Sequence, residues 1–266
     1  MSLSKGELYT FVTNKNGKGK QGTLVASIKG TLSKDIVDVL MKLSVDKRLQ
    51  VQEVTLDMAR NMESAVKQVF TNASLVTDRF HVIKLAMEAL QHIRVSLRWE
   101  ELDKENEAIK QAKVQQKKYE PTLLENGETP KQLLARCKYI VAKKPNDWTE
   151  NQTQKANLLF KHFPQLQTAY YHSLDFRNIY ENTQKTTAKI AFEKWIEKIH
   201  TEGMNHFFTV ANTVKYNLDN ILNFFDYRST NANAESFNSK IKLFRANQRG
   251  VTDTKFFLFR LQKLFA

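Results

Sequence analysis

The sequence predicts an α/β fold in which a small sheet is interrupted by a long block of helices. The first third of the chain alternates short strand patterns with helical patterns, residues 79 to about 227 show only helical spacing, and one more helical pattern follows near the C-terminus. With 266 residues, of which 41% are hydrophobic, the chain can bury one large core or one core with a sizeable insertion.

Two strands and a short connection open the predicted sheet. Residues 7–13, E-L-Y-T-F-V-T, alternate apolar and polar side chains, and residues 23–28 resume a strand pattern. The stretch between them, residues 14–22, is rich in Gly, Asn and Lys, as expected of a turn. We therefore predict a β-hairpin.

Two helices and two more strands complete the first third. We expect Ser33 to be the N-cap of a helix. Its apolar residues recur at helical spacing at Ile36, Val37, Leu40 and Leu43. A third strand, residues 51–56, ends at Asp57, and a fourth, residues 73–77, ends at Asp78. A second helix lies between these strands and is marked by Met62, Val66, Val69 and Phe70.

A helical block follows from Arg79 to about Tyr227, with no convincing strand pattern in it. Its first helix is predicted to extend to about Tyr119. The apolar stripe of that helix consists of Phe80, Ile83, Met87, Leu90, Ile93 and Leu97. We divide the chain into a first core segment at 1–85, a helical insertion at 86–227, and C-terminal helices at 228–266 that complete the core.

The charge balance indicates a polyanionic partner, with nucleic acid as the first expectation. Lys and Arg outnumber Asp and Glu by 41 to 28, which gives a net charge of +13. No run of eighteen apolar residues and no signal-peptide pattern occurs, so we expect a cytoplasmic protein without a membrane partner. The single cysteine, Cys137, excludes an intramolecular disulfide, and we expect it to be a buried small hydrophobic residue.

Acidic residues stand directly after two of the predicted strands, where α/β sheets present their ligands. These residues are Asp57 and Asp78, and His81 follows Asp78 by three positions. Each aspartate also fits the simpler interpretation of a helix N-cap or turn residue.

A polar helical face near the C-terminus adds a third acid. On a helix, Glu235, Asn238, Lys242 and Arg245 lie on one face, opposite a buried face with Phe237, Ile241 and Phe244. A carboxylate beside an amide and two cations suits a metal ion held against a phosphate backbone, although an ordinary solvated helix has a similar mixture.

Four segments together resemble the DDE transposases of bacterial insertion sequences, in the branch called ISL-three. The segments are V-T-L-D-M-A-R (54–60), A-S-L-V-T-D-R-F-H-V-I-K (73–84), E-A-L-Q-H-I-R (88–94) and T-N-A-N-A-E-S-F-N-S-K-I-K (230–242). D-R-F-H and N-A-x-A-E-x-x-N-x-x-I-K, in this order with a helical block between them, are more specific than any single motif.

This resemblance implies a catalytic core with a ribonuclease-H-like mixed sheet. It implies that Asp57 is the second catalytic carboxylate and Glu235 the third, both as metal ligands, with Asp78, His81 and Asn238 supporting the site. The cofactor would be Mg²⁺, for which Mn²⁺ can substitute. The partner would be DNA, as transposon ends and target, contacted by Lys240, Lys242 and Arg245 and by the basic helical block, which includes Lys117, Lys118, Lys143 and Lys144.

The first catalytic aspartate of such cores lies on the first strand, immediately upstream of the hairpin, and no Asp precedes Asp35 in this sequence. We therefore expect a sheet that is incomplete at its first strand, in a chain that is truncated at its N-terminus and inactive as it stands. The resemblance also implies a homodimer in the active assembly. The alternatives are a non-catalytic DNA-binding or assembly module and a nuclease of the same fold.

Overall fold

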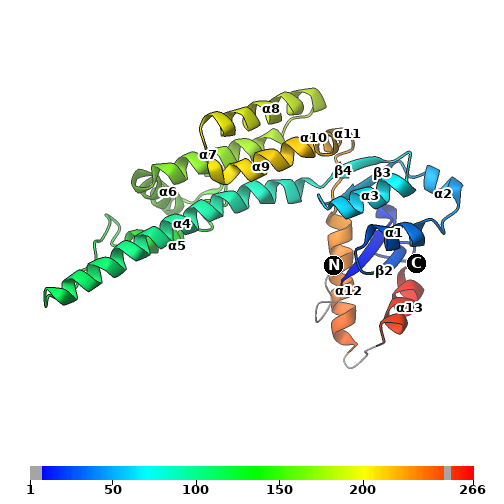
Figure 1. Ribbon diagram of the computed structural model, residues 1–266, viewed down its shortest axis with the longest axis horizontal. Coiled ribbons are helices and arrows are strands. Elements are labelled where there is room, and N and C mark those ends of the chain that lie inside the picture. The colour runs from blue at the N-terminus through cyan, green and yellow to red at the C-terminus, as the bar shows by residue number, and fades with distance from the viewer. Residues whose placement is uncertain (1–7, 249–252) are drawn as a thin grey trace. The chain divides into compact units, whose positions relative to one another are not determined.

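The computed structural model describes residues 8–248 and 253–266, which form two compact units (Figure 1). The residues up to His81 and from Asp219 onward make up the first unit, and Val82–Leu218 make up the second. We describe each unit by itself. None of the helices in the described ranges is both long enough and apolar enough to span a membrane.

The predicted hairpin is confirmed in the first unit. Strands β1 (Tyr9–Thr13) and β2 (Leu24–Lys29) pair antiparallel, and their connection contains a short 3-10 helix, η1 (Lys15–Gly17). The Asn14 side chain accepts a hydrogen bond from the Asn16 amide at 3.0 Å and caps this turn. Only glycine fits at position 17, because a Cβ there would lie 2.5 Å from the Thr23 Cα. The loop therefore has a defined shape that places Lys15.

The third and fourth predicted strands are also present. Strands β3 (Glu53–Leu56) and β4 (Ser74–Thr77) pair in parallel, from Glu53 opposite Ser74 to Leu56 opposite Thr77. Among the described residues, β1 and β2 form one two-stranded sheet, and β3 and β4 form another. The mixed sheet expected from the sequence is therefore present as two separate pairs of strands.

Three helices alternate with these strands along the chain. Helices α1 (Ser33–Leu40) and α2 (Val45–Leu49) lie between β2 and β3, and α3 (Arg60–Val69) lies between β3 and β4. The prediction that Ser33 caps α1 is wrong, since the helix begins at Ser33 and Leu32 occupies the N-cap without a side-chain hydrogen bond. The short helix α2 was not predicted. Side chains from both strand pairs pack with side chains of α1 and α3 in one hydrophobic core. Its buried members are Ala26, Ile28, Ile36, Leu40, Ala65, Val66, Val69, Phe70 and Leu75.

Strand β3 divides its side chains between two faces. Val54 and Leu56 pack against this core, so the alternating residues Glu53 and Thr55 lie on the opposite face. Asp57 directly follows the strand and continues the same alternation. A polar row, Glu53, Thr55 and Asp57, is thereby placed on the face of the sheet turned away from α1 and α3.

The second unit contains no strand in the described residues 82–218, as the sequence predicts. Its helices are α4 (Arg79–Val114), which starts in the first unit, α5 (Pro130–Arg136), η2 (Pro145–Asp147), α6 (Glu150–His162), α7 (Pro164–Ile179), α8 (Lys185–Thr201) and α9 (Asn205–Tyr216). Helix α4 ends five residues before the predicted end at Tyr119. Cys137 is buried as predicted, and burial raises the pKa of its thiol to about 11.

The chain returns to the first unit through α10 (Leu218–Leu222) and α11 (Phe224–Tyr227), and ends with α12 (Ala232–Asn247) and α13 (Thr254–Phe265). Phe237 and Ile241 of α12 are buried against Phe257 and Leu261 of α13 and against Leu24 of β2. The buried face predicted for α12 is thus confirmed for these two residues, while Phe244 is only partly buried. This second core attaches α12 to the hairpin.

Candidate metal centre

Three side chains from two distant parts of the sequence converge in the first unit. Asp78, His81 and Glu235 each offer one ligand atom, and these atoms all lie within 4.8 Å of one another. The His81 Nε2 lies 3.7 Å from the Glu235 Oε1. Two carboxylates and one imidazole are suitable ligands for a divalent cation. The residues present therefore fit a metal ion, with one ligand after β4, one on α4 and one on α12.

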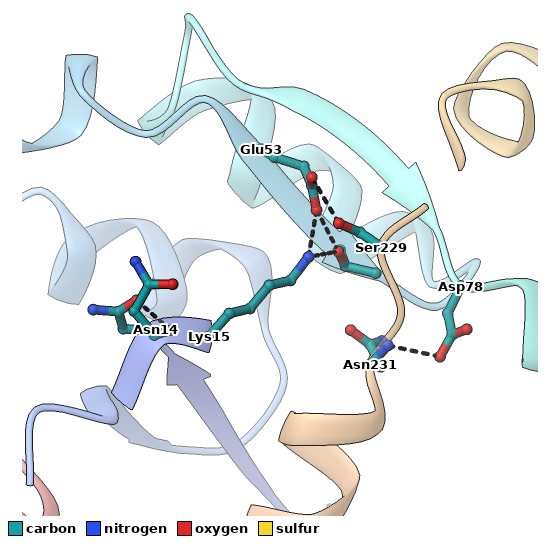
Figure 2. A network of polar contacts seen from close by, with 8 residues as sticks. Asn14, Lys15, Glu53, Asp78, Ser229 and Asn231 are labelled. Carbon is teal, nitrogen blue, oxygen red and sulfur yellow. Dashed lines mark hydrogen bonds and ion pairs between the residues drawn. The ribbon is translucent and has the colours of Figure 1, made fainter. Parts of the chain in front are cut away.

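Asp78 is the buried member of this group, with 2% of its surface exposed. One carboxylate oxygen accepts a hydrogen bond from the Phe80 amide, and the other accepts one from the Asn231 amide, both at 3.1 Å. Asp78 therefore caps the first turn of α4 and also binds the backbone just before α12 (Figure 2). Asp78 thus makes the contacts of a helix cap and also offers a ligand atom to the candidate metal centre.

His81 and Glu235 are the more accessible members of the group. His81 lies in the first turn of α4 with its side chain one third exposed, and its ring meets the Phe80 ring edge-on. Glu235 lies in the first turn of α12, and half of its side chain is exposed. Both side chains can therefore reach a ligand that approaches from solvent.

Asp57 is not a member of this group of three. It is exposed, and its carboxylate accepts a hydrogen bond from the Ala59 amide at 3.1 Å. Its strand, however, is the direct neighbour of β4, and the Asp78 amide continues the ladder by donating to the Leu56 carbonyl at 3.0 Å. Asp57 and Asp78 therefore follow paired positions on adjacent parallel strands, and lie at the same end and on the same face of that sheet.

The remaining predicted residues lie along α12. Asn238 is half-buried one turn after Glu235, and Lys242 is exposed. Lys240 donates to the Gly19 carbonyl at 3.3 Å, and the Arg245 guanidinium lies 5.0 Å from the centre of the Phe257 ring. Of the three predicted DNA-contacting cations, Lys240 and Arg245 thus also contact their own chain.

A partly buried polar cluster beside the group was not predicted from the sequence (Figure 2). Glu53 forms an ion pair with Lys15, and its second oxygen accepts a hydrogen bond from the Ser229 hydroxyl at 2.8 Å. Burial raises the pKa of Glu53, but the hydrogen bonds from Lys15 and two hydroxyl groups outweigh it and lower the pKa below the ordinary value. The alternation E-V-T-L-D places Glu53 on the same strand face as Asp57, but no local pattern marks Glu53 or its partner Ser229 as part of this region.

Positive charge is concentrated in the unit that holds this group. The first unit carries 20 Lys and Arg against 12 Asp and Glu, a net charge of +8, and the second carries 21 against 16, a net charge of +5. In the second unit, Lys143 donates to Gln152 at 3.2 Å and Lys144 pairs with Glu181. The helical unit is therefore basic, as the sequence predicts, but less so than the unit that holds the candidate metal centre.

Comparison with known proteins identifies the family. A family model described as Transposase, of the DDE type and ISL-three branch, matches residues 1–261. Neither a search of curated proteins nor a search of solved structures gives a significant match. The family match covers nearly all of the chain, including both segments that supply the metal-centre residues. The chain therefore belongs to the ISL-three family of DDE transposases.

Proposed function

We propose that this chain is the catalytic region of a transposase that cleaves and joins DNA strands with the help of divalent metal ions. Its family supports a function in transposition. The observation that carries the finer proposal is the convergence of Asp78, His81 and Glu235, since 157 positions separate the first from the last. Titratable side chains that converge from distant segments and can share one ligand are the arrangement that marks a candidate active site.

The acids have separate tasks in this proposal. Glu235 and Asp57 are the catalytic carboxylates, and Asp78 and His81 complete or support the binding of the cation. Mg²⁺ or Mn²⁺, when bound, would activate the attacking oxygen and stabilise the leaving oxygen of the phosphodiester. Lys242, exposed on α12 two turns beyond Glu235, would bind a backbone phosphate, and Asn238 would lie beside the scissile strand.

We further propose that the two strand pairs are parts of one ribonuclease-H-like mixed sheet. Strands β1 and β3 each have only one partner among the described strands. A further strand that paired with both would join β1–β2 to β3–β4 and cover two hydrogen-bonding edges. By the family resemblance that strand carries the remaining catalytic aspartate, beside Asp57. Residues 1–266 would then bind metal and DNA without cleaving the DNA. We also propose that the active assembly is a homodimer.

The test compares residues 1–266 with a chain extended at its N-terminus by the strand and the DNA-recognition segments that the family resemblance implies before the hairpin. Mn²⁺ binding is measured by calorimetry, and cleavage is measured on DNA that bears the element's own end. We expect Mn²⁺ binding by both chains and metal-dependent cleavage by the extended chain only.

Variants of the extended chain assign the acids. Asp57→Asn and Glu235→Gln should abolish cleavage, whereas Asp38→Asn, which changes an exposed acid on α1, should not. Full cleavage by either of the first two variants would remove that residue from the catalytic set. DNA binding without any Mn²⁺ binding by the wild-type protein would favour a non-catalytic DNA-binding module.

A further inference from the structure

The chain that returns from the helical unit is bound along strands β3 and β4 by side chains before it enters α12. The side-chain amide of Asn223 donates to the Leu75 carbonyl at 2.8 Å, and the Tyr227 and Ser74 hydroxyls lie 3.2 Å apart. The connection ends with the Ser229 and Asn231 contacts described above. Residues 223–231 are thus held to a sheet about 150 positions earlier in the sequence.

The backbone turns out of the right-handed helical conformation at Arg228, the residue that directly follows α11. This residue has a left-handed conformation with a φ of 53°, which is unfavourable for a residue other than glycine. Its guanidinium lies 5.3 Å and 5.2 Å from the ring centres of Phe224 and Phe225. Because regular secondary structure is interrupted here, the position of α12 depends on side-chain contacts on either side of the turn.

Glu53 receives the contact nearest to this turn, and its own position is fixed from two directions. The Thr55 hydroxyl donates to one carboxylate oxygen at 2.8 Å, and the Lys15 ammonium binds the same oxygen. The other oxygen accepts the Ser229 hydroxyl. Glu53 is not among the residues whose ligand atoms converge in the metal centre. Its carboxylate instead binds the segment between α11 and α12 through Ser229 (Figure 2).

The next contact of the connection comes two positions later. Ser229 is bound at the start of β3, and Asn231 is bound by Asp78 just beyond the end of β4, so the segment runs along the polar face of the strand pair. Helix α12 begins at the following residue, and Glu235 lies in its first turn. A shift of this segment would move Glu235 relative to Asp78 and His81.

We propose that Glu53 and Ser229 are positioning residues for the metal centre, because they fix the segment that sets where Glu235 meets Asp78 and His81. This inference rests on the proposed function. It predicts that loss of the Ser229 hydroxyl loosens the first turn of α12 and weakens metal binding, although Ser229 contacts no metal ligand directly.

The experiment compares three variants of residues 1–266. Ser229→Ala removes the hydroxyl, and Ser229→Thr keeps it. Asn220→Ala is the matched control, since it removes another bond between the returning chain and a carboxylate, the 3.1 Å contact of Asn220 with Glu63 on α3. Hydrogen exchange of the peptide backbone over residues 229–240 is measured without metal, and Mn²⁺ affinity is measured by calorimetry.

We expect Ser229→Ala to speed exchange in the first turn of α12 and to weaken Mn²⁺ binding about tenfold, as loss of an outer contact at a metal site commonly does. Ser229→Thr should bind Mn²⁺ like the wild type, and so should Asn220→Ala, even if its melting temperature falls. Unchanged Mn²⁺ affinity in Ser229→Ala would overturn the positioning role while leaving the proposed function intact. A wild-type protein that binds no Mn²⁺ would overturn both.

Discussion

At the scale of single residues, Asp78 makes the contacts of a helix cap and also lies in the candidate metal centre, two interpretations that sequence reasoning treats as alternatives. Its buried carboxylate accepts two backbone N–H groups that lie 151 positions apart, those of Phe80 and Asn231, and it also belongs to the group with His81 and Glu235. A carboxylate has about four acceptor sites, so two hydrogen bonds leave capacity for a cation. Asp78 can therefore connect α4, α12 and a bound metal.

Asp78→Asn should destabilise the metal-free protein by about 1–3 kcal/mol, because an amide keeps one acceptor oxygen and loses the second, charged one. Asp57→Asn is the control. Its side chain is exposed and an amide oxygen can still accept from the Ala59 amide, so its effect should stay within about 0.5 kcal/mol. Calorimetric melting without metal measures both. Equal stability of the two variants would mean that the contacts of Asp78 do not hold the fold.

The lowered pKa of Glu53 makes a prediction about pH. A carboxyl whose folded-state pKa is depressed contributes stability that is fully present above its ordinary value of 4.5 and is lost as the pH falls through the lowered value. The difference in unfolding free energy between the wild type and Glu53→Gln should therefore be constant above about pH 5.5 and shrink on acidification below 4.5. Urea titrations from pH 3 to 7 check this. A difference that grows on acidification would contradict the assigned pKa direction.

The residues of the centre differ in how far the sequence could predict them. Acids directly after strands are a local signal that selects Asp57 and Asp78, and the polar face of a helical pattern selects Glu235, but their roles at one site were assigned through the family resemblance. Glu53 could not be recognised as part of this region, because its partner Ser229 lies 176 positions away and no local pattern records such a contact. Non-local side-chain pairs are decided by packing rather than by sequence periodicity.

At the scale of elements, sequence periodicity predicted the helices and strands that have a strong pattern, but it did not predict where each of them ends. The hairpin, β3, α3 and β4 follow clear alternation or helical spacing. Helix α2 has only five residues, too few for a periodic signal. Helix α4 ends at Val114, where no Gly or Pro occurs. Gln116 there takes the left-handed conformation, with a φ of 53°, and the Lys117 amide donates to the Ala112 carbonyl at 2.9 Å. This is a helix C-terminus of the kind that glycine usually marks.

Gln116→Gly should therefore stabilise the helical unit by about 0.5–1 kcal/mol, because glycine adopts the left-handed conformation without the cost that a side chain imposes. Gln111→Gly, five residues earlier within α4, should destabilise it by about 1 kcal/mol. The three tryptophans, Trp99, Trp148 and Trp195, all lie in this unit and report its urea unfolding by fluorescence. The same sign for both substitutions would exclude Gln116 as the terminating residue.

At the scale of the whole molecule, the sequence order explains how one site can be assembled from both ends of the chain. The helical unit is inserted between His81 and Asp219, so the segments before and after it belong to one compact unit that holds all three converging side chains. Helical spacing predicted that this part of the chain contains helices and no strand, as the described residues 82–218 do. Composition could not predict that most of the excess positive charge lies outside this part, because net charge does not determine which residues fold together.

The final prediction concerns DNA binding by residues 1–266. If, as proposed, these residues contact DNA mainly through backbone phosphates, binding should be weak, largely independent of sequence, and strongly reduced between low and physiological salt. Lys242→Ala should weaken binding to every sequence alike and reduce the slope of log affinity against log salt by about one. Lys67→Ala is the control, because Lys67 on α3 pairs with Glu63 at 2.7 Å. Titrations at four salt concentrations on two unrelated duplexes measure both slopes. Tight binding to one duplex with little salt dependence would mean that this region reads bases itself, and an unchanged slope in Lys242→Ala would place the phosphate contacts on another face.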